Sequence, residues 1–337
     1  MIRLHRNIIT KPVHFDKDKV QTENMNALAL YDKNRDTEEG IDELRKKFKF
    51  KQYRDNEVKE ALKIICNNKC AYCESSFLHV YYGDIEHFRP KKLISNPGQN
   101  DIKPGYYWLS NEWENLLLSC LFCNQSKGQL VPQLENGQIT LKKLSIGKQN
   151  QFPLSDDQLF RKRRDHTSWP TIFTKDEKER LLLNPFTEDP EKHLQYTEEG
   201  VIQAKKLRGQ SGVSPRGTAS IEVYALQRIY LVQERKKRII EVQSQINQVM
   251  EAILKLDEFS AAGNQVVVTH YQEKIDAETR RLFYYTHPRQ AYSGMCRQFV
   301  YHFLKKKLKM KMALIRALEE EEHAKETVRR SEDPFQI

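Results

Sequence analysis

Apolar residues recur at helical intervals in two parts of the chain. After Asp55, a suitable helix N-cap, they follow with a helical period as far as Ile65. Residues 1–50 have only scattered apolar positions and no sustained period. The pattern therefore predicts a loosely structured N-terminal arm over residues 1–53 and then a short helix.

The second half of the chain has longer helical patterns. Between Ser220 and about Phe259, apolar residues lie on one face and charged residues on the other, which predicts one long helix. A similar pattern covers residues 297–328. We expect residues 201–337 to form a mainly helical domain that contacts a partner or nucleic acid.

The region between these parts has shorter elements. Residues 70–128 alternate short apolar runs with Gly, Pro and Asn, which is typical of a small site built from a hairpin, loops and short helices. Asn136-Gly137 predicts a hairpin turn, and the basic run Arg161–Arg164 predicts an exposed loop. The expected fold class is α+β, with a small core over residues 54–200 embedded in a mainly helical chain.

Composition narrows the class of protein. The 337 residues include 56 Lys and Arg against 46 Asp and Glu, and residues 201–337 carry most of the positive excess. A net charge of +10 fits a polyanionic partner such as nucleic acid, although basic proteins often bind none. Mean hydropathy is −0.74 and no window is apolar enough to span a bilayer, so we expect no membrane partner. Without a signal-like N-terminus, the cytoplasm is the expected location.

Four of the six cysteines form two C-x-x-C pairs, Cys70/Cys73 and Cys120/Cys123. Each pair presents two thiolates from one tight turn, and two pairs complete the tetrahedral shell of a structural Zn²⁺. Four buried, unligated cysteines are the alternative, which this spacing disfavours. Cys66 and Cys296 lack such partners and are interpreted as ordinary buried thiols.

Polar residues with catalytic chemistry lie between and just after the cysteine pairs. Glu86 and His87 are neighbours, and Asn124 directly follows the last cysteine. The oxygens of Glu86 and Asn124 suit a hard cation, Mg²⁺ or Mn²⁺, whereas the sulfurs suit zinc. The sequence therefore predicts two different metals.

These residues resemble the HNH (ββα-metal) nuclease superfamily. Glu86-His87 with Pro90, Asn115-Leu116, and Cys123-Asn124 with Lys127 match its motif elements in order. The resemblance implies a zinc-stabilised ββα-metal core in which His87 is the general base. It makes Glu86 and Asn124 the ligands of the catalytic ion, and Asn115 the organiser of the loop that aims His87. Because the first ligand is usually Asp, it stays open whether Asp84 joins the metal site.

A closer resemblance, over about residues 54–235, is to the HNH subunit of Septu-type anti-phage systems, which is also found with some retrons. Four strings carry it: Cys70-Ala71-Tyr72-Cys73-Glu74, Ile85-Glu86-His87-Phe88-Arg89-Pro90-Lys91, Tyr107-Trp108-Leu109 with Glu112-Trp113-Glu114-Asn115-Leu116, and Leu182-Leu183-Asn184-Pro185. It implies an antiviral effector nuclease working beside an SMC/ABC-like ATPase. Residues 129–151 look like an insertion.

Two functions of different class remain open. The first is an active nuclease that cuts nucleic acid, with DNA favoured over RNA and with Lys127 and Arg89 contacting phosphate. The second is a zinc-stabilised binding or scaffolding subunit without catalysis. The basic clusters Arg161–Arg164, Arg235–Arg238 and Lys305–Lys307 fit phosphate contacts or solvent-facing surfaces equally well. The acidic run Glu319–Glu322 is interpreted as a solvated face or a docking surface for a basic partner.

Overall fold

The computed structural model describes residues 1–34, 37–135, 138–156, 166–207, 209 and 211–331. The chain is mixed α and β, with mostly helices and small two-stranded sheets, as the α+β prediction requires. It divides into two compact units. The first comprises Met1–Leu194 and Ile202–Ile229, and the second comprises Gln195–Val201 and Tyr230–Ile337. This division lies near residue 229, whereas the predicted domain boundary was at residue 200.

The N-terminal residues are ordered helices that pack into the first unit, so the expectation of a loosely structured arm is wrong. They form η1 (Arg6–Ile8), η2 (Val13–Asp16), α1 (Asp18–Asn34), α2 (Glu38–Lys47) and η3 (Gln52–Arg54). On α1, Val20, Ala27 and Tyr31 are buried. The ring of Tyr31 stacks on Tyr107 with centroids 4.0 Å apart. Tyr31 thus anchors α1 to the segment around Tyr107, which precedes the second strand.

The helix predicted after Asp55 is present as α3 (Asn56–Ile65). The carboxylate of Asp55 accepts a hydrogen bond from the Glu57 amide, as an N-cap does, and the apolar face of the helix is buried. The helix ends because Asn67 and Asn68 both adopt left-handed backbone angles. The chain then turns directly into the first cysteine pair.

Two antiparallel strands form the centre of the first unit. β1 (Asp84–His87) pairs with β2 (Leu116–Ser119), and Glu86 lies opposite Leu117. The short helices η4 (Tyr107–Leu109) and η5 (Trp113–Asn115) precede β2. α4 (Leu121–Asn124) follows β2 and contacts β1. All four residues of β2 are buried, which explains why three of them are leucines.

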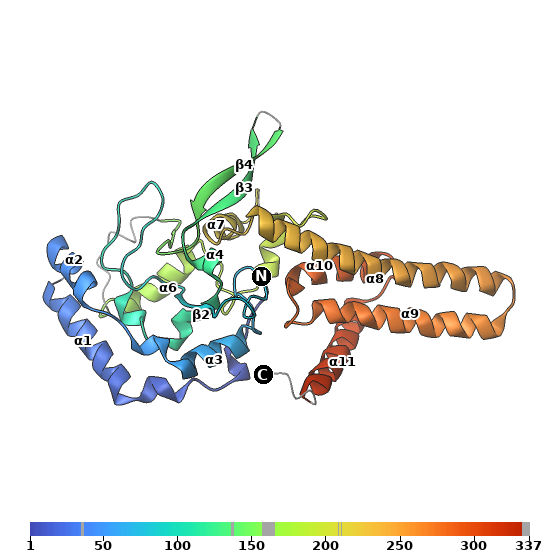
Figure 1. The fold of residues 1–337 in the computed structure, drawn as a ribbon, viewed down its shortest axis with the longest axis horizontal. Coiled ribbons are helices and arrows are strands. Elements are labelled where there is room, and N and C mark those ends of the chain that lie inside the picture. Colours follow the sequence, from blue (N-terminus) through green and yellow to red (C-terminus); the bar gives the residue numbers. More distant parts are fainter. Residues whose placement is uncertain (35–36, 136–137, 157–165, 208, 210, 332–337) are drawn as a thin grey trace. The chain divides into compact units, whose positions relative to one another are not determined.

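The predicted hairpin follows α4. β3 (Lys127–Glu135) pairs with β4 (Gln138–Ile146) and projects from the rest of its unit (Figure 1). The Asn136-Gly137 turn itself lies outside the described residues. At the base, the side chain of Gln129 donates hydrogen bonds to the carbonyls of Phe122 and Ile146. The hairpin is therefore an insertion that begins and ends beside α4.

The remaining short elements of the first unit lead toward the long helices. They are α6 (Trp169–Glu179), η6 (Pro190–Lys192), β6 (Ile202–Ala204) and α7 (Pro215–Val223), and β5 (Leu194–Tyr196) begins at the last residue of the unit's first segment. One helix was predicted over residues 220–259, but α7 ends at Val223 and α8 (Ile229–Ala261) begins six residues later. Ala225 has a left-handed backbone, φ 52°, which breaks the helix.

The described part of the second unit is mainly helical. α8 and α9 (Gln265–Thr286) run side by side in opposite directions (Figure 1), and the Phe259 and Tyr271 rings stack between them. α10 (Ser293–Lys306) and α11 (Met312–Ser331) both pack on α9. No helix in the described part of the chain is both long and apolar enough to cross a membrane.

Candidate functional site

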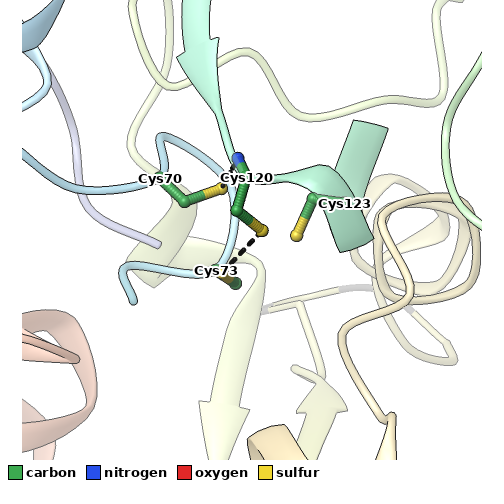
Figure 2. Close-up of side chains that lie close together, drawn as sticks. All are labelled: Cys70, Cys73, Cys120 and Cys123. Carbon is green, nitrogen blue, oxygen red and sulfur yellow. Dashed lines mark hydrogen bonds between the residues drawn. The ribbon is translucent and has the colours of Figure 1, made fainter. Parts of the chain in front are cut away.

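The two C-x-x-C pairs converge at one end of the β1–β2 pair. The thiols of Cys70, Cys73, Cys120 and Cys123 are buried and lie within 4.8 Å of one another (Figure 2). Cys73 Sγ and Cys120 Sγ are 3.8 Å apart. Four Zn–S bonds of about 2.3 Å in a tetrahedron separate the sulfurs by about 3.8 Å, whereas a disulfide needs about 2.0 Å. The four cysteines can therefore hold a structural metal such as zinc, as predicted.

Arg228 provides a buried positive charge for these thiols. Its guanidinium lies 3.5 Å from both Cys73 Sγ and Cys123 Sγ, and 3.8 Å from Cys120 Sγ. Four thiolates around Zn²⁺ carry a net charge of −2, so a buried cation offsets part of the desolvation cost. Sequence reasoning missed Arg228 because it lies 105 residues after Cys123 and belongs to no cysteine motif.

His87 ends β1 and its imidazole is held at both nitrogens. Nε2 lies 2.8 Å from the Ser110 carbonyl, which can only accept, so Nε2 carries the ring proton. Nδ1 then accepts a hydrogen bond from the Lys91 ammonium at 3.1 Å. Burial, and next the positive charge of Lys91, lower the pKa of His87 well below its usual value. The imidazole is therefore neutral at pH 7, with its lone pair on Nδ1.

Asn115 fixes the backbone that follows His87. Its side-chain oxygen accepts from the Arg89 amide at 2.8 Å, and its amide nitrogen donates to the carbonyls of Arg89 at 3.0 Å and Leu109 at 3.1 Å. Its own carbonyl accepts from the Phe88 amide. One side chain thus ties the end of β1 to the loop that carries Ser110, and this loop orients His87.

Glu86 binds a residue that was not among the predicted site residues. The buried ammonium of Lys148 lies 2.6 Å from Glu86 Oε1 and also donates to the His87 carbonyl at 2.9 Å. Lys148 follows the hairpin, and its amide donates to the Cys123 carbonyl, so the returning chain packs against α4. No motif identified Lys148, because the hairpin separates it from the rest of the site.

Asp84 and Asn124 form a second polar group on the same face of β1 as Glu86. The amide nitrogen of Asn124 donates to Asp84 Oδ2 at 2.9 Å, and that of Gln125 donates to the same oxygen at 3.1 Å. The Tyr81 hydroxyl donates to Asp84 Oδ1. Because the side-chain nitrogen of Asn124 faces Asp84, its side-chain oxygen can bind another partner. These carboxylate and amide oxygens are the donors that Mg²⁺ or Mn²⁺ prefers.

One cavity of about 410 Å³ brings these groups together. Its lining includes Glu86, His87 and Asn124, and also Asp84. Basic side chains surround them: Arg54, Lys59 and Lys91. Three of the predicted site residues therefore line a polar cavity that three basic side chains also line. Asn115 is not among the lining residues and acts through the loop that orients His87.

The two residues expected to contact phosphate lie elsewhere. Lys127 is an exposed residue at the start of β3, beyond the end of α4 at Asn124. Arg89 is buried, and its guanidinium binds Asp176 at 2.9 Å and Glu177 at 2.7 Å. With both carboxylates engaged, Arg89 has a structural role, and the geometry does not support the expected phosphate contact.

The charged clusters that had alternative interpretations are largely engaged within the chain. Arg235 is buried, and Lys236, Lys237 and Arg238 pair with Glu199, Glu234 and Glu241. The acidic run is also paired: Glu321 and Glu322 bind Arg280 and Lys325. Lys305–Lys307 are exposed. The cluster Arg161–Arg164 lies outside the described residues.

Fold and site together define a mixed α and β protein in which a four-cysteine cluster holds a two-stranded unit beside a polar cavity. The chain is similar to Septu protein PtuB of Bacillus mycoides (strain KBAB4), with 35% identity over 233 residues, 69% of this chain and 64% of the relative. It is also similar to Septu protein PtuA of the same strain, with 28% identity over 180 residues, 53% of this chain and 20% of the relative. Septu protein PtuB of Bacillus thuringiensis is 39% identical over 72 residues, 21% of this chain and 23% of the relative.

In each case the matched region covers less than two thirds of the relative. No protein-family model matches the chain, and no solved structure matches it.

Proposed function

We propose that this chain is a metal-dependent endonuclease of the HNH type that hydrolyses nucleic-acid phosphodiester bonds. We propose further that it acts in an anti-phage defence system of the Septu kind. The similarity to two proteins named Septu PtuB and one named Septu PtuA supports the defence role. The order of Glu86, His87, Asn115 and Asn124, together with the β1–β2–α4 arrangement, supports the nuclease class.

The observation that carries the proposal is the way His87 is held. The Ser110 carbonyl fixes the ring proton on Nε2, Asn115 fixes the surrounding loop, and His87 lines a cavity that Glu86 and Asn124 also line. A general base needs a neutral nitrogen, a fixed orientation and access to a reacting water. His87 meets the first two in this structure and lines a cavity that suits the third.

In the proposed mechanism, His87 Nδ1 takes a proton from a water molecule that attacks the phosphorus. Lys91 now occupies the hydrogen-bonding position at Nδ1, and an incoming phosphate offers its ammonium a stronger partner, which frees Nδ1 for water. Glu86 and Asn124 are the proposed ligands of Mg²⁺ or Mn²⁺, and Asp84 is a further carboxylate in the same cavity. When bound, the ion would stabilise the negative charge that develops on the phosphate and the leaving oxygen.

The proposed substrate is DNA rather than RNA, and the proposed partner is an SMC/ABC-like ATPase. Similarity to both a PtuB and a PtuA protein supports a two-component system. Plasmid DNA incubated with the purified chain and Mg²⁺ or Mn²⁺, with and without the partner, tests the activity. We expect cutting by the wild type and none by His87→Ala. Equal cutting by both proteins, or no cutting by either under any of these conditions, would contradict the proposal.

One observation favours the alternative of a catalytically silent binding or scaffolding subunit. The ammonium of Lys148 forms an ion pair with one oxygen of Glu86, so this carboxylate has a cationic partner without a metal. If the chain binds nucleic acid but neither cuts it nor takes up Mn²⁺ beyond the cysteine site, this alternative is correct.

A further inference from the structure

A second cavity adjoins the one at His87. It measures about 350 Å³ and is lined by Lys49, Phe50, Lys51, Arg54, Lys91 and Lys92. Arg54 and Lys91 also line the His87 cavity, so the two cavities share a wall. The side chains of Arg54 and Lys91 can therefore contact a ligand in either cavity.

The second cavity is strongly cationic. Five of its six lining residues are Lys or Arg, and none is acidic. Burial, and then repulsion by the cations of Arg54, Lys92 and Lys148, lower the pKa of Lys91 to about 7, although Glu86 opposes this shift. A cation whose neighbours disfavour its charge is stabilised when an anion binds. The cavity thus has the electrostatics of an anion site.

The N-terminal helices hold this cationic segment in place. The carboxylate of Glu23, on α1, accepts hydrogen bonds from the amides of Lys51 at 2.9 Å and Gln52 at 3.2 Å. The same carboxylate accepts from Asn111 at 3.1 Å, in the loop that carries Ser110. The backbone of residues 51–52 is therefore fixed to the loop that orients His87. The side chains of Lys49 and Lys51 stay exposed.

We propose that this second cavity binds a backbone phosphate of a nucleic-acid strand whose neighbouring phosphodiester lies at His87. The inference rests on the proposed nuclease function and names its substrate-binding residues, which are Lys49, Lys51 and Lys92. Adjacent phosphates on one strand need consecutive cationic positions, and the shared wall of Arg54 and Lys91 links these positions. Phosphate contacts of this kind set the position of the strand without reading its sequence.

The test measures nucleic-acid binding without catalysis. Fluorescein-labelled single-stranded DNA, duplex DNA and single-stranded RNA are titrated in chelator, and anisotropy gives the affinity at several salt concentrations. The test variant is Lys49→Gln/Lys51→Gln/Lys92→Gln. The matched control is Lys305→Gln/Lys306→Gln/Lys307→Gln, which removes the same charge from exposed positions on α10 and just after it. Urea unfolding of both variants confirms that they fold like the wild type.

We expect the test variant to bind about tenfold more weakly, or worse, than the control at about 0.15 M salt. Each lost phosphate contact also lowers the slope of log K against log salt by about 0.9 on duplex DNA and about 0.7 on a single strand. Comparing the affinities for the three probes shows whether the bound strand is DNA or RNA. Lys51→Glu alone, at an exposed position, should weaken binding in the same direction.

The inference is overturned if the test variant keeps wild-type affinity and salt slope, or if the wild type binds none of the three probes. Adding Mn²⁺ separates this result from the nuclease proposal. Wild type that binds through these lysines but never cuts leaves the inference standing and ends the nuclease proposal. If the wild type and the test variant bind with equal affinity and cut at equal rates, the nuclease proposal stands and the inference is overturned.

Discussion

Lys148 and Glu86 form an ion pair with side chains 0% and 8% exposed. Removing one partner of such a pair leaves an uncompensated buried charge, which typically costs about 3–5 kcal/mol. We expect Lys148→Met to lower the free energy of unfolding by that amount in chelator, and Mn²⁺ to restore part of it. Urea unfolding monitored by circular dichroism measures this. Lys127→Met, at an exposed position, should change stability by less than about 0.5 kcal/mol.

Because of His87, the free energy of unfolding should decrease as pH falls. Its folded pKa lies below the ordinary value of about 6.5 because of burial and Lys91, so the unfolded chain binds the proton first as pH falls. Its contribution is therefore present above about pH 6.5 and is lost as pH falls toward the folded pKa. The stability difference between wild type and His87→Gln should shrink between about pH 7 and about pH 5. A difference that is constant over this range contradicts the assigned environment.

At this scale, the sequence could identify residues that belong to a motif but not their partners. The role expected for Asn115, organising the loop at His87, agrees with its three side-chain hydrogen bonds, although its catalytic importance stays a prediction. The motif gave no sign that Arg89 faces Asp176, because that contact spans 87 residues. Lys148 and Arg228 were missed for the same reason.

The hairpin β3–β4 must return the chain to α4 so that Lys148 reaches Glu86, and Gly147 makes this return. Its φ is +143°, and an added Cβ would lie 2.1 Å from the Gln125 carbonyl oxygen. Gly147→Ala should therefore destabilise the protein by more than Gly98→Ala. Gly98 also has positive φ but has open space around it, so the alanine should cost only about 1–2 kcal/mol. Equal effects in urea unfolding would show that the close approach is absent.

Element boundaries were predictable where a local signal marks them. Asn136-Gly137 predicted the hairpin and Asp55 predicted the start of α3, and both elements are present. The break between α7 and α8 was not predictable from periodicity, because Tyr224, Ala225 and Leu226 continue the apolar pattern and are all buried. Tertiary packing there overrides the local preference for a continuous helix.

Across the whole molecule, metal bound by the four cysteines should stabilise the first unit more than the second. The cluster joins segments around residues 70 and 120, while α8 to α11 contribute none of its four ligands. We expect Cys120→Ser, or removal of zinc by a strong chelator, to raise hydrogen exchange around residues 66–125 far more than in α9 and α10. Zinc content should fall from about one ion per chain in the wild type. Uniform loss of protection would indicate one cooperative unit.

The N-terminal helices show what a sequence pattern cannot predict at this scale. Residues 1–53 have too few apolar positions for a helical period to be visible, yet α1 is anchored by Val20, Ala27 and Tyr31. The ring of Tyr31 stacks on Tyr107, far along the chain, and no local pattern encodes that contact. The mainly helical second unit was predictable because its apolar faces repeat over many turns.

The rate of phosphodiester cleavage by a His87→Gly variant, with and without added imidazole, tests the central claim most directly. Single-turnover cleavage in Mn²⁺ should fall about 10²–10⁴-fold in the variant, with unchanged nucleic-acid affinity, and imidazole should restore part of the rate. A variant that cuts as fast as the wild type, or that loses affinity and rate in equal proportion, would contradict the assignment of His87 as the general base.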